Sequence, residues 1–200
     1  MSQIQRSAAI DRITRETEIH LTLDLDGSGQ SRIATGVGFL DHMLELFAKH
    51  ALFDLTVQAQ GDRHIDDHHT TEDVGIVLGQ ALVQAVGDKA GIRRYGHCVL
   101  PMDETLVTTA VDLSGRAYLG WTVSMPSPLI GTFASELVEE FWRSVAFQTR
   151  MNLHVIQHSG TNTHHVSEAI FKSTARSLRM ACEKDSRSNA IPTPGGRQCF

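Results

Sequence analysis

The sequence predicts an α+β fold of two internally duplicated halves, each with the order β-β-α-β-α. Each half is expected to be a small mixed sheet backed by helices, with a pseudo-two-fold axis relating the halves. Two observations support this prediction. The predicted elements follow one another in the same order twice, with a period of about 95 residues that is too long for a solenoid repeat. The motif HHxxE also occurs twice, at 68–72 and 164–168, each time opening a half's last helix.

The first half contains patterns typical of both strands and helices. Apolar and polar residues alternate over 17–25, as in a half-buried strand. Apolar residues at helical spacing over 39–50 predict an amphipathic helix. The expected elements are a strand at 17–25, a hairpin turn at 26–29, a short strand through Ile33, a helix at 39–50, a strand at 53–60 and a helix from the motif to about Val86.

The second half repeats this order. Its expected elements are a strand at 96–113 with a turn near Pro101, a turn at 114–116, a strand at 117–125, a helix at 133–149, a strand at 151–158 and a helix from about His164 to Glu183. Gly87 and Gly91 separate the halves. We therefore expect half-domain repeats at 1–93 and 94–186, followed by a C-terminal tail at 187–200. Because the order β-β-α-β-α is common, coincidence is the alternative explanation for the repeated topology, but the repeated motif favours duplication.

The composition is that of an ordinary globular protein. Of 200 residues, 41% are hydrophobic and 20% charged, and the formal net charge is −5. No Lys/Arg block indicates a nucleic acid or membrane partner, and no apolar stretch approaches the roughly 18–20 residues that span a bilayer. The N-terminus lacks the apolar core of a signal peptide. Odd in number and widely spaced, the cysteines indicate free thiols in a reducing cytoplasm: Cys98, Cys182 and Cys199.

The HHxxE motif has the spacing of a metal-binding helix. Positions i and i+4 share a helical face, so His68 with Glu72, or His164 with Glu168, can grip one ion. The other histidine of each motif points about 100° away and can serve a second ion. Each motif therefore offers parts of two sites. Imidazole with carboxylate suits Mn, Fe, Co, Ni or Zn.

Six histidines and two glutamates divide evenly into two sites of three imidazoles and one carboxylate. The candidate ligands are His42, His68, His69, Glu72, His154, His164, His165 and Glu168. A core histidine is the alternative for His42, and a solvated strand histidine is the alternative for His154. Asp66 or Asp67 can cap the second predicted helix of the first half. Spacing alone leaves open whether the half-sites meet within one chain or between subunits.

Several stretches, taken together, resemble one enzyme family. FLDHMLELFAKHALFDL, GDRHIDDHHTTEDVGIVLGQAL, VDLSGRAYLG and GTNTHHVSEAIFKSTARSLRMA occur in the order typical of the imidazoleglycerol-phosphate dehydratases of histidine biosynthesis. The similarity runs from about Arg12 to Asp185, nearly the whole chain. The resemblance implies a duplicated α+β fold, a homo-oligomeric shell of 24 subunits, and two manganese ions at each active site, between subunits.

The resemblance also implies the reaction, a hydro-lyase step that converts imidazole glycerol phosphate to imidazole acetol phosphate. In the implied mechanism, metals hold the substrate ring as an imidazolate, whose electrons help expel the C3 hydroxyl. A diazafulvene-like intermediate results, and the C2 proton then becomes removable by a general base. Matching the motifs gives the metal ligands proposed above, and RITRETEI puts the acid/base glutamate at Glu16.

For the substrate phosphate, the resemblance implies Arg94, Arg116 and Lys172, with Arg93 as the alternative to Arg94. The tail departs from the family, which usually carries a Ser/Thr-Lys-Gly stretch. Here the tail reads IPTPGGRQCF, so Arg197 or the glycine amides would have to replace the lysine. Two other functions compete with the dehydratase: a binuclear metallohydrolase that releases phosphate, and a metal-storing shell that needs neither Glu16 nor the arginines.

Overall fold

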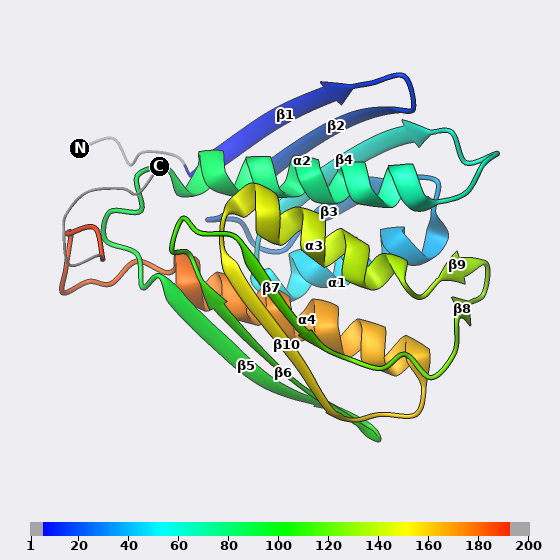
Figure 1. Ribbon diagram of the computed structural model, residues 1–200. Coiled ribbons are helices and arrows are strands. Elements are labelled where there is room, and N and C mark those ends of the chain that lie inside the picture. Colours follow the sequence, from blue (N-terminus) through cyan, green and yellow to red (C-terminus); the bar gives the residue numbers. More distant parts are fainter. Residues whose placement is uncertain (1–5, 193–200) are drawn as a thin grey trace.

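The computed structural model describes residues 6–192, which fold into two sheets with a layer of helices between them (Figure 1). The first half supplies a four-stranded sheet in the order β1-β2-β4-β3, in which only the β3–β4 pair is parallel. Its elements are β1 (Ser7–Ile13), β2 (Thr17–Asp24), β3 (Ser31–Ala34), α1 (Gly38–Ala51), β4 (Asp54–Gly61) and α2 (His68–Val86).

The second half has the same topology, with sheet order β5-β6-β10-β7 and one parallel pair, β7 with β10. Its elements are β5 (Tyr95–Met102), β6 (Thr105–Asp112), β7 (Tyr118–Thr122), β8 (Leu129–Ile130), β9 (Phe133–Ala134), α3 (Leu137–Thr149), β10 (Asn152–Ser159) and α4 (Thr163–Cys182). The predicted fold class, a duplicated α+β structure with mixed sheets backed by helices, is therefore confirmed.

The four-stranded sheet of each half has one more strand than the sequence predicted. In the first half this is β1, which pairs antiparallel with β2. In the second half, the strand predicted at 96–113 is a hairpin of β5 and β6 that turns at Asp103 and Glu104, two residues beyond Pro101. The helix predicted from Phe133 begins at Leu137, because 129–134 form the small β8–β9 ribbon around Gly131 (φ 61°).

The helices of the two halves pack against each other rather than only against their own sheets. α2 lies on the first sheet and contacts α3 of the second half, while α4 lies on the second sheet and contacts α1 of the first. Large aromatic side chains fill the centre, where Phe47, Phe141, Trp142 and Phe171 are fully buried. The Trp142 and Phe171 rings lie 4.9 Å apart. This crossed helix packing brings side chains from different halves together at the beginning of each helix.

Four further sequence-based expectations concern membrane spans, cysteines, the boundary between the halves and the C-terminal tail. No described helix is both long enough and apolar enough to cross a membrane. Cys98 and Cys182 are free thiols, and Cys199 lies outside the described residues. The predicted boundary at 93/94 falls between α2 and β5. Most of the C-terminal stretch that differs from the family pattern, including Arg197, also lies outside the described residues.

Candidate active site

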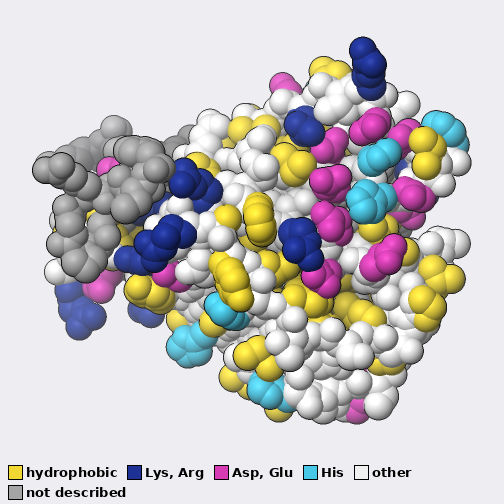
Figure 2. Space-filling view, viewed as in Figure 1, with side chains coloured by type: hydrophobic (Ala, Val, Ile, Leu, Met, Phe, Trp, Pro, Cys, Tyr) yellow, Lys and Arg dark blue, Asp and Glu magenta, His cyan; other side chains and the backbone are white. Residues whose placement is uncertain are grey.

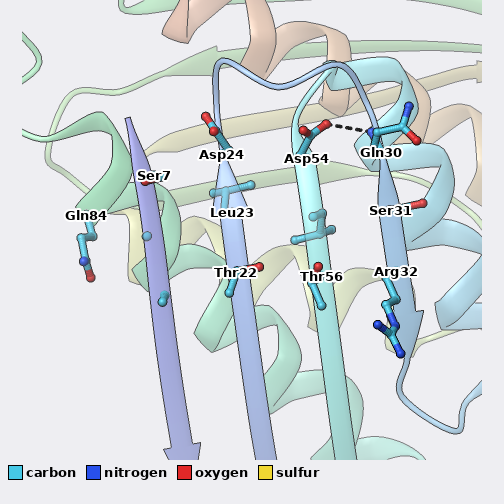
Figure 3. Close-up of a pocket in the computed structure, with 13 residues that line it drawn as sticks. Ser7, Thr22, Leu23, Asp24, Gln30, Ser31, Arg32, Asp54, Thr56 and Gln84 are labelled. Atoms are coloured by element: carbon cyan, nitrogen blue, oxygen red, sulfur yellow. Dashed lines mark hydrogen bonds between the residues drawn. The ribbon is translucent and has the colours of Figure 1, made fainter. Parts of the chain in front are cut away.

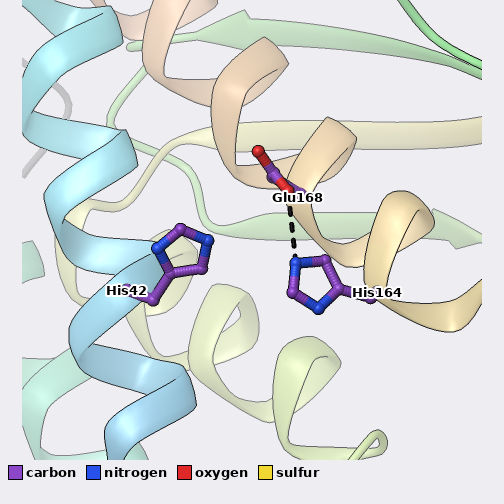
Figure 4. A group of neighbouring side chains, drawn as sticks. All are labelled: His42, His164 and Glu168. Carbon is purple, nitrogen blue, oxygen red and sulfur yellow. Dashed lines mark ion pairs between the residues drawn. The ribbon is translucent and has the colours of Figure 1, made fainter.

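Three predicted metal ligands come together where α1 packs against α4 (Figure 4). His42 projects from α1 toward His164 and Glu168 of α4, and one donor atom from each lies within 4.8 Å of the others. His164 Nε2 is 3.3 Å from Glu168 Oε2. The side chain of Asn162 caps α4 by accepting the backbone N–H groups of His164 and His165. This cap sets where the helix begins, and so where the motif presents its side chains.

The donor set of this cluster fits a first-row divalent metal, since two imidazoles and a carboxylate suit manganese as well as iron, cobalt, nickel or zinc. Glu168 is buried and forms an ion pair with Lys172 one turn later on α4. Burial acts to raise the pKa of Glu168, but Lys172 and the two imidazoles outweigh it, so the pKa is lowered. The carboxylate is therefore held ionised, as a metal ligand must be.

The motif of the first half lies at the beginning of α2. His68 Nε2 and Glu72 Oε2 are 3.9 Å apart on one helical face, and both side chains are partly exposed. α1 and α3 both end on a left-handed residue, Leu52 and Arg150. His42 stands ten residues before Leu52, and Glu140 stands ten residues before Arg150, so the two occupy matching positions. Because α3 packs on α2 as α1 packs on α4, Glu140 is the pseudo-symmetric counterpart of His42. Glu140 Oε2 lies 3.6 Å from Arg143 Nε on the same helix.

The second histidine of each motif is hydrogen-bonded to a carboxylate. His69 Nδ1 lies 2.9 Å from Asp62 Oδ2, and His165 Nδ1 lies 2.8 Å from Glu104 Oε2. These contacts raise the pKa of both histidines. The hydrogen bond with His165 is the main reason why the pKa of Glu104 is lowered to about 2. Asp62 and Glu104 were not predicted, because neither is part of a spaced motif.

Glu16 lies in the turn between β1 and β2, beside the motif of the first half. Its Oε2 is 4.0 Å from His69 Nδ1, and its side chain is 54% exposed. The backbone carbonyl of Glu16 accepts the N–H of Asp62, which ties this turn to the loop that precedes α2. The carboxylate is thus next to a candidate metal ligand and open to a substrate, as an acid/base group requires.

The predicted phosphate-binding arginines lie at the other end of the second sheet. Arg94 is largely buried, donating from Nε and Nη2 to Asp112 at 2.7 and 3.1 Å and from Nη1 to the carbonyl of Pro192 at 2.7 Å. Arg116 is exposed in the turn before β7. Arg93, the alternative to Arg94, is half exposed and pairs with Glu183. Lys172, in contrast, lies beside the metal-ligand cluster.

His154 is separated from the other candidate ligands of its own chain. It is exposed on the outer face of the second sheet, with its ring 5.3 Å from that of Tyr118. Its imidazole lies across Gly120, where an added Cβ would come within 2.5 Å of Nδ1. β10 ends at Ser159, just before the motif on α4, and His154 lies five positions earlier, about 16 Å along the strand. His154 can therefore join a metal site only if another subunit supplies the remaining ligands.

Charged groups are distributed unevenly over the molecule. Acidic and histidine side chains gather where α2 and α3 begin, on the right of the view in Figure 2. The start of β10, near Arg94 and Arg116, lies seven residues from its end, about 23 Å along the strand. The end with the HHxxE motifs and the end with the arginines are therefore far apart in one chain.

A separate cavity of about 630 Å³ lies on the outer face of the first sheet (Figure 3). It contains none of the predicted ligands. Its carboxylate Asp54 accepts the backbone N–H groups of Gln30 and Ser28, each at 2.8 Å. These hydrogen bonds lower the pKa of Asp54, and the one from Gln30 has the largest effect. Asp54 therefore organises the turn between β2 and β3.

Comparison with known proteins identifies relatives of the whole fold. The sequence profile described as imidazoleglycerol-phosphate dehydratase matches residues 35–178. The imidazoleglycerol-phosphate dehydratase of Granulibacter bethesdensis is 60% identical over 192 residues, covering 96% of this chain and 98% of the relative. That of Rhodopirellula baltica is 56% identical, covering 98% and 96%.

Solved structures agree with these sequence matches. The crystal structure of imidazoleglycerol-phosphate dehydratase from Staphylococcus aureus superposes with a TM-score of 0.82 at 44% identity, covering 90% of this chain and 99% of that one. The enzyme from Pyrococcus furiosus gives a TM-score of 0.79 at 32% identity, covering 94% and 99%.

Proposed function

The chain belongs to the imidazoleglycerol-phosphate dehydratase family, hydro-lyases that dehydrate imidazole glycerol phosphate in histidine biosynthesis, and from this we propose a two-manganese active site shared between subunits. The observation that carries the proposal is the cluster of His42, His164 and Glu168. We also propose that the enzyme works in the cytoplasm.

The two half-sites hold different ligands. We assign His42, His164 and Glu168 to the first, and His68 and Glu72 to the second, where Glu140 takes the place of His42. The remaining predicted ligands, His69, His154 and His165, would complete the two sites from neighbouring subunits. When bound, manganese would act as a Lewis acid and as a template for the substrate imidazole, favouring the diazafulvene-like route.

The chain's own residues supply the proton transfer and the phosphate contacts. Glu16, exposed beside His69, is placed to take up the C2 proton after the C3 hydroxyl has left. Lys172 lies beside Glu168 and brings a cation to the metal-binding end. Arg116 and Arg94 would bind the phosphate from the opposite end.

Subunit sharing follows from the separation of these ends. The substrate is an imidazole ring, a three-carbon chain and one phosphate, which is much shorter than the roughly 23 Å between the two ends of β10. The ligands of the two HHxxE motifs and the arginines of one chain cannot reach the same substrate molecule. A complete site therefore takes its motif ligands and arginines from different subunits, which supports the proposed homo-oligomer; the number of 24 subunits is proposed from the family resemblance.

The proposal is tested by turnover of imidazole glycerol phosphate before and after chelation. We expect keto product without phosphate release, loss of activity on chelation, and recovery with manganese. Glu168→Gln should bind less metal and lose activity. Folded, manganese-loaded protein that yields no keto product would refute the dehydratase, and free phosphate would favour a metallohydrolase.

Subunit sharing is tested by co-expressing two inactive variants, Glu72→Gln and Arg116→Ala. If Glu72 and Arg116 of one site come from different chains, random mixing regenerates about a quarter of the sites. Mixed assemblies without activity, despite both subunits being present, would place both residues of a site on one chain.

A further inference from the structure

We propose that Asp62 and Glu104 are positioning residues, which hold the imidazoles of His69 and His165 so that Nε2 of each is presented to a metal ion. In both histidines it is Nδ1 that meets the carboxylate, at 2.9 and 2.8 Å. An Nδ1–H that donates to a carboxylate leaves the lone pair on Nε2, which is the tautomer a metal requires there. The inference rests on the proposed metal site.

The two carboxylates reach their histidines from different places in the duplicated fold. Gly61 and Gly160 are equivalent, since an added Cβ would strike Thr70 in one half and its counterpart Val166 in the other. The residue after Gly61 is Asp62, but the residue after Gly160 is Thr161, which has no carboxylate.

Glu104 supplies the carboxylate in the second half. Thr17 begins β2 as Thr105 begins β6, so the residues before them, Glu16 and Glu104, are equivalent. Glu104 turns its Oε2 to His165, and its Oε1 accepts the backbone N–H of Thr161 at 3.1 Å. The halves thus diverged in sequence, yet each kept a carboxylate on Nδ1 of its second histidine. This recurrence argues that the contact serves the site rather than one local loop.

The surroundings of Asp62 support the same conclusion. Its side chain is only 14% exposed, and Oδ1 is buried without a hydrogen-bond partner among the described residues. Burying an unpaired carboxylate oxygen destabilises a fold. Because His69 is the partner of this carboxylate among the described residues, we infer that Asp62 is there to hold His69 rather than to stabilise the fold.

The arrangement also explains why only one of the two equivalent glutamates is free. Asp62 occupies Nδ1 of His69, so Glu16 stays 4.0 Å away and 54% exposed. In the second half Thr161 stands at the position of Asp62, and Glu104 is held by His165 and the loop amides instead. Glu16 remains available for proton transfer, whereas Glu104 holds the imidazole of His165 in place.

The test is manganese affinity, measured from the electron paramagnetic resonance signal of free Mn²⁺ at one fixed pH. Asp62→Ala should weaken one class of site by about 10–100-fold, the range found when a carboxylate behind a ligand histidine is removed. Asp62→Asn keeps an acceptor for Nδ1–H and should lose less. The matched control is Asp66→Asn, which removes the same charge from the same loop but can still cap His68.

Stability separates a positioning role from a structural one. Because Asp62 has few fold contacts, its metal-free variants should melt within a few degrees of the parent protein. Glu104→Gln should likewise weaken metal binding while keeping acceptors for the loop amides. Asp62 variants whose manganese affinity stays within about twofold of the parent would overturn this inference but not the proposed function. A folded parent that binds no manganese would refute the proposed function as well as the inference.

Discussion

Arg94 offers a sharp test, because the family resemblance assigns it to the substrate phosphate whereas the structure gives it structural partners. Each of its three guanidinium nitrogens donates a hydrogen bond within the chain: Nε and Nη2 to Asp112, and Nη1 to the carbonyl of Pro192. The Arg94 and Asp112 side chains are 12% and 18% exposed, so solvent screens the pair weakly. We expect Arg94→Lys to act first on stability.

The magnitude follows from the hydrogen bonds that the substitution removes. A lysine ammonium can replace one of them but not the forked pair, so about two charge-assisted hydrogen bonds disappear. At roughly 1.5 kcal/mol each, the free energy of unfolding falls by about 3 kcal/mol. For a chain of this size, that corresponds to a melting temperature lower by about 6–12 °C.

The assay is thermal unfolding of the parent and variant, together with their KM for substrate. Arg93→Lys is the matched control, because Arg93 is half exposed and its pair with Glu183 should contribute at most about 1 kcal/mol. Arg116→Lys should raise KM without a comparable loss of stability. An Arg94→Lys variant that melts with the parent but has a raised KM would refute the structural role of Arg94.

Three further predictions concern packing, pH and catalysis. Gly75→Ala should destabilise the protein by about 1–3 kcal/mol in urea unfolding, because the new Cβ would lie 2.8 Å from the carbonyl of Phe141; Gly38→Ala, with open space around it, should be tolerated. The pKa of Asp54 is below its unfolded value of 3.8, so its stabilisation is present above that pH and is lost as pH falls through the lower folded value. Asp54→Asn should therefore flatten the acid side of a stability–pH curve, and an unchanged slope would contradict this. Glu16→Gln should lower kcat by about 10²–10⁴-fold while metal content stays at the parent level; a near-normal kcat would exclude Glu16 as the acid/base group.

The sequence predicts the helices well and the strands less well, for physical reasons. Helices α1, α2 and α4 carry strong apolar periodicity or the HHxxE motif, and their ends fall within a residue or so of the predicted positions. β1 has no comparable alternation, because it is an edge strand that exists through its pairing with β2. Pro101 indicated a nearby turn, and the β5–β6 turn does follow two residues later; Pro101 itself stays in β5, an edge strand in which a missing N–H is tolerated.

The candidate site divides in a similar way. Ligands on one helix, such as His164 and Glu168, follow from spacing, since i and i+4 must share a face. The contribution of His42 depends on α1 of the first half packing against α4 of the second, which no local pattern contains. Glu104 was missed for the same reason, since it reaches His165 from a turn 61 residues earlier in the chain.

Duplication gave two similar motifs, but crossed helix packing made the two half-sites chemically different. α1 gives His42 to the motif on α4, so that half-site has two imidazoles and one carboxylate. The counterpart of His42 on α3 is Glu140, so the half-site at the motif on α2, as proposed above, has two carboxylates, Glu72 and Glu140. A divalent ion is fully neutralised by two carboxylates but only half neutralised by one, so the two half-sites should hold the same metal with different strengths. A manganese titration of the parent protein should therefore resolve two classes of site, and a single class would mean that ligands from neighbouring subunits offset the difference in charge.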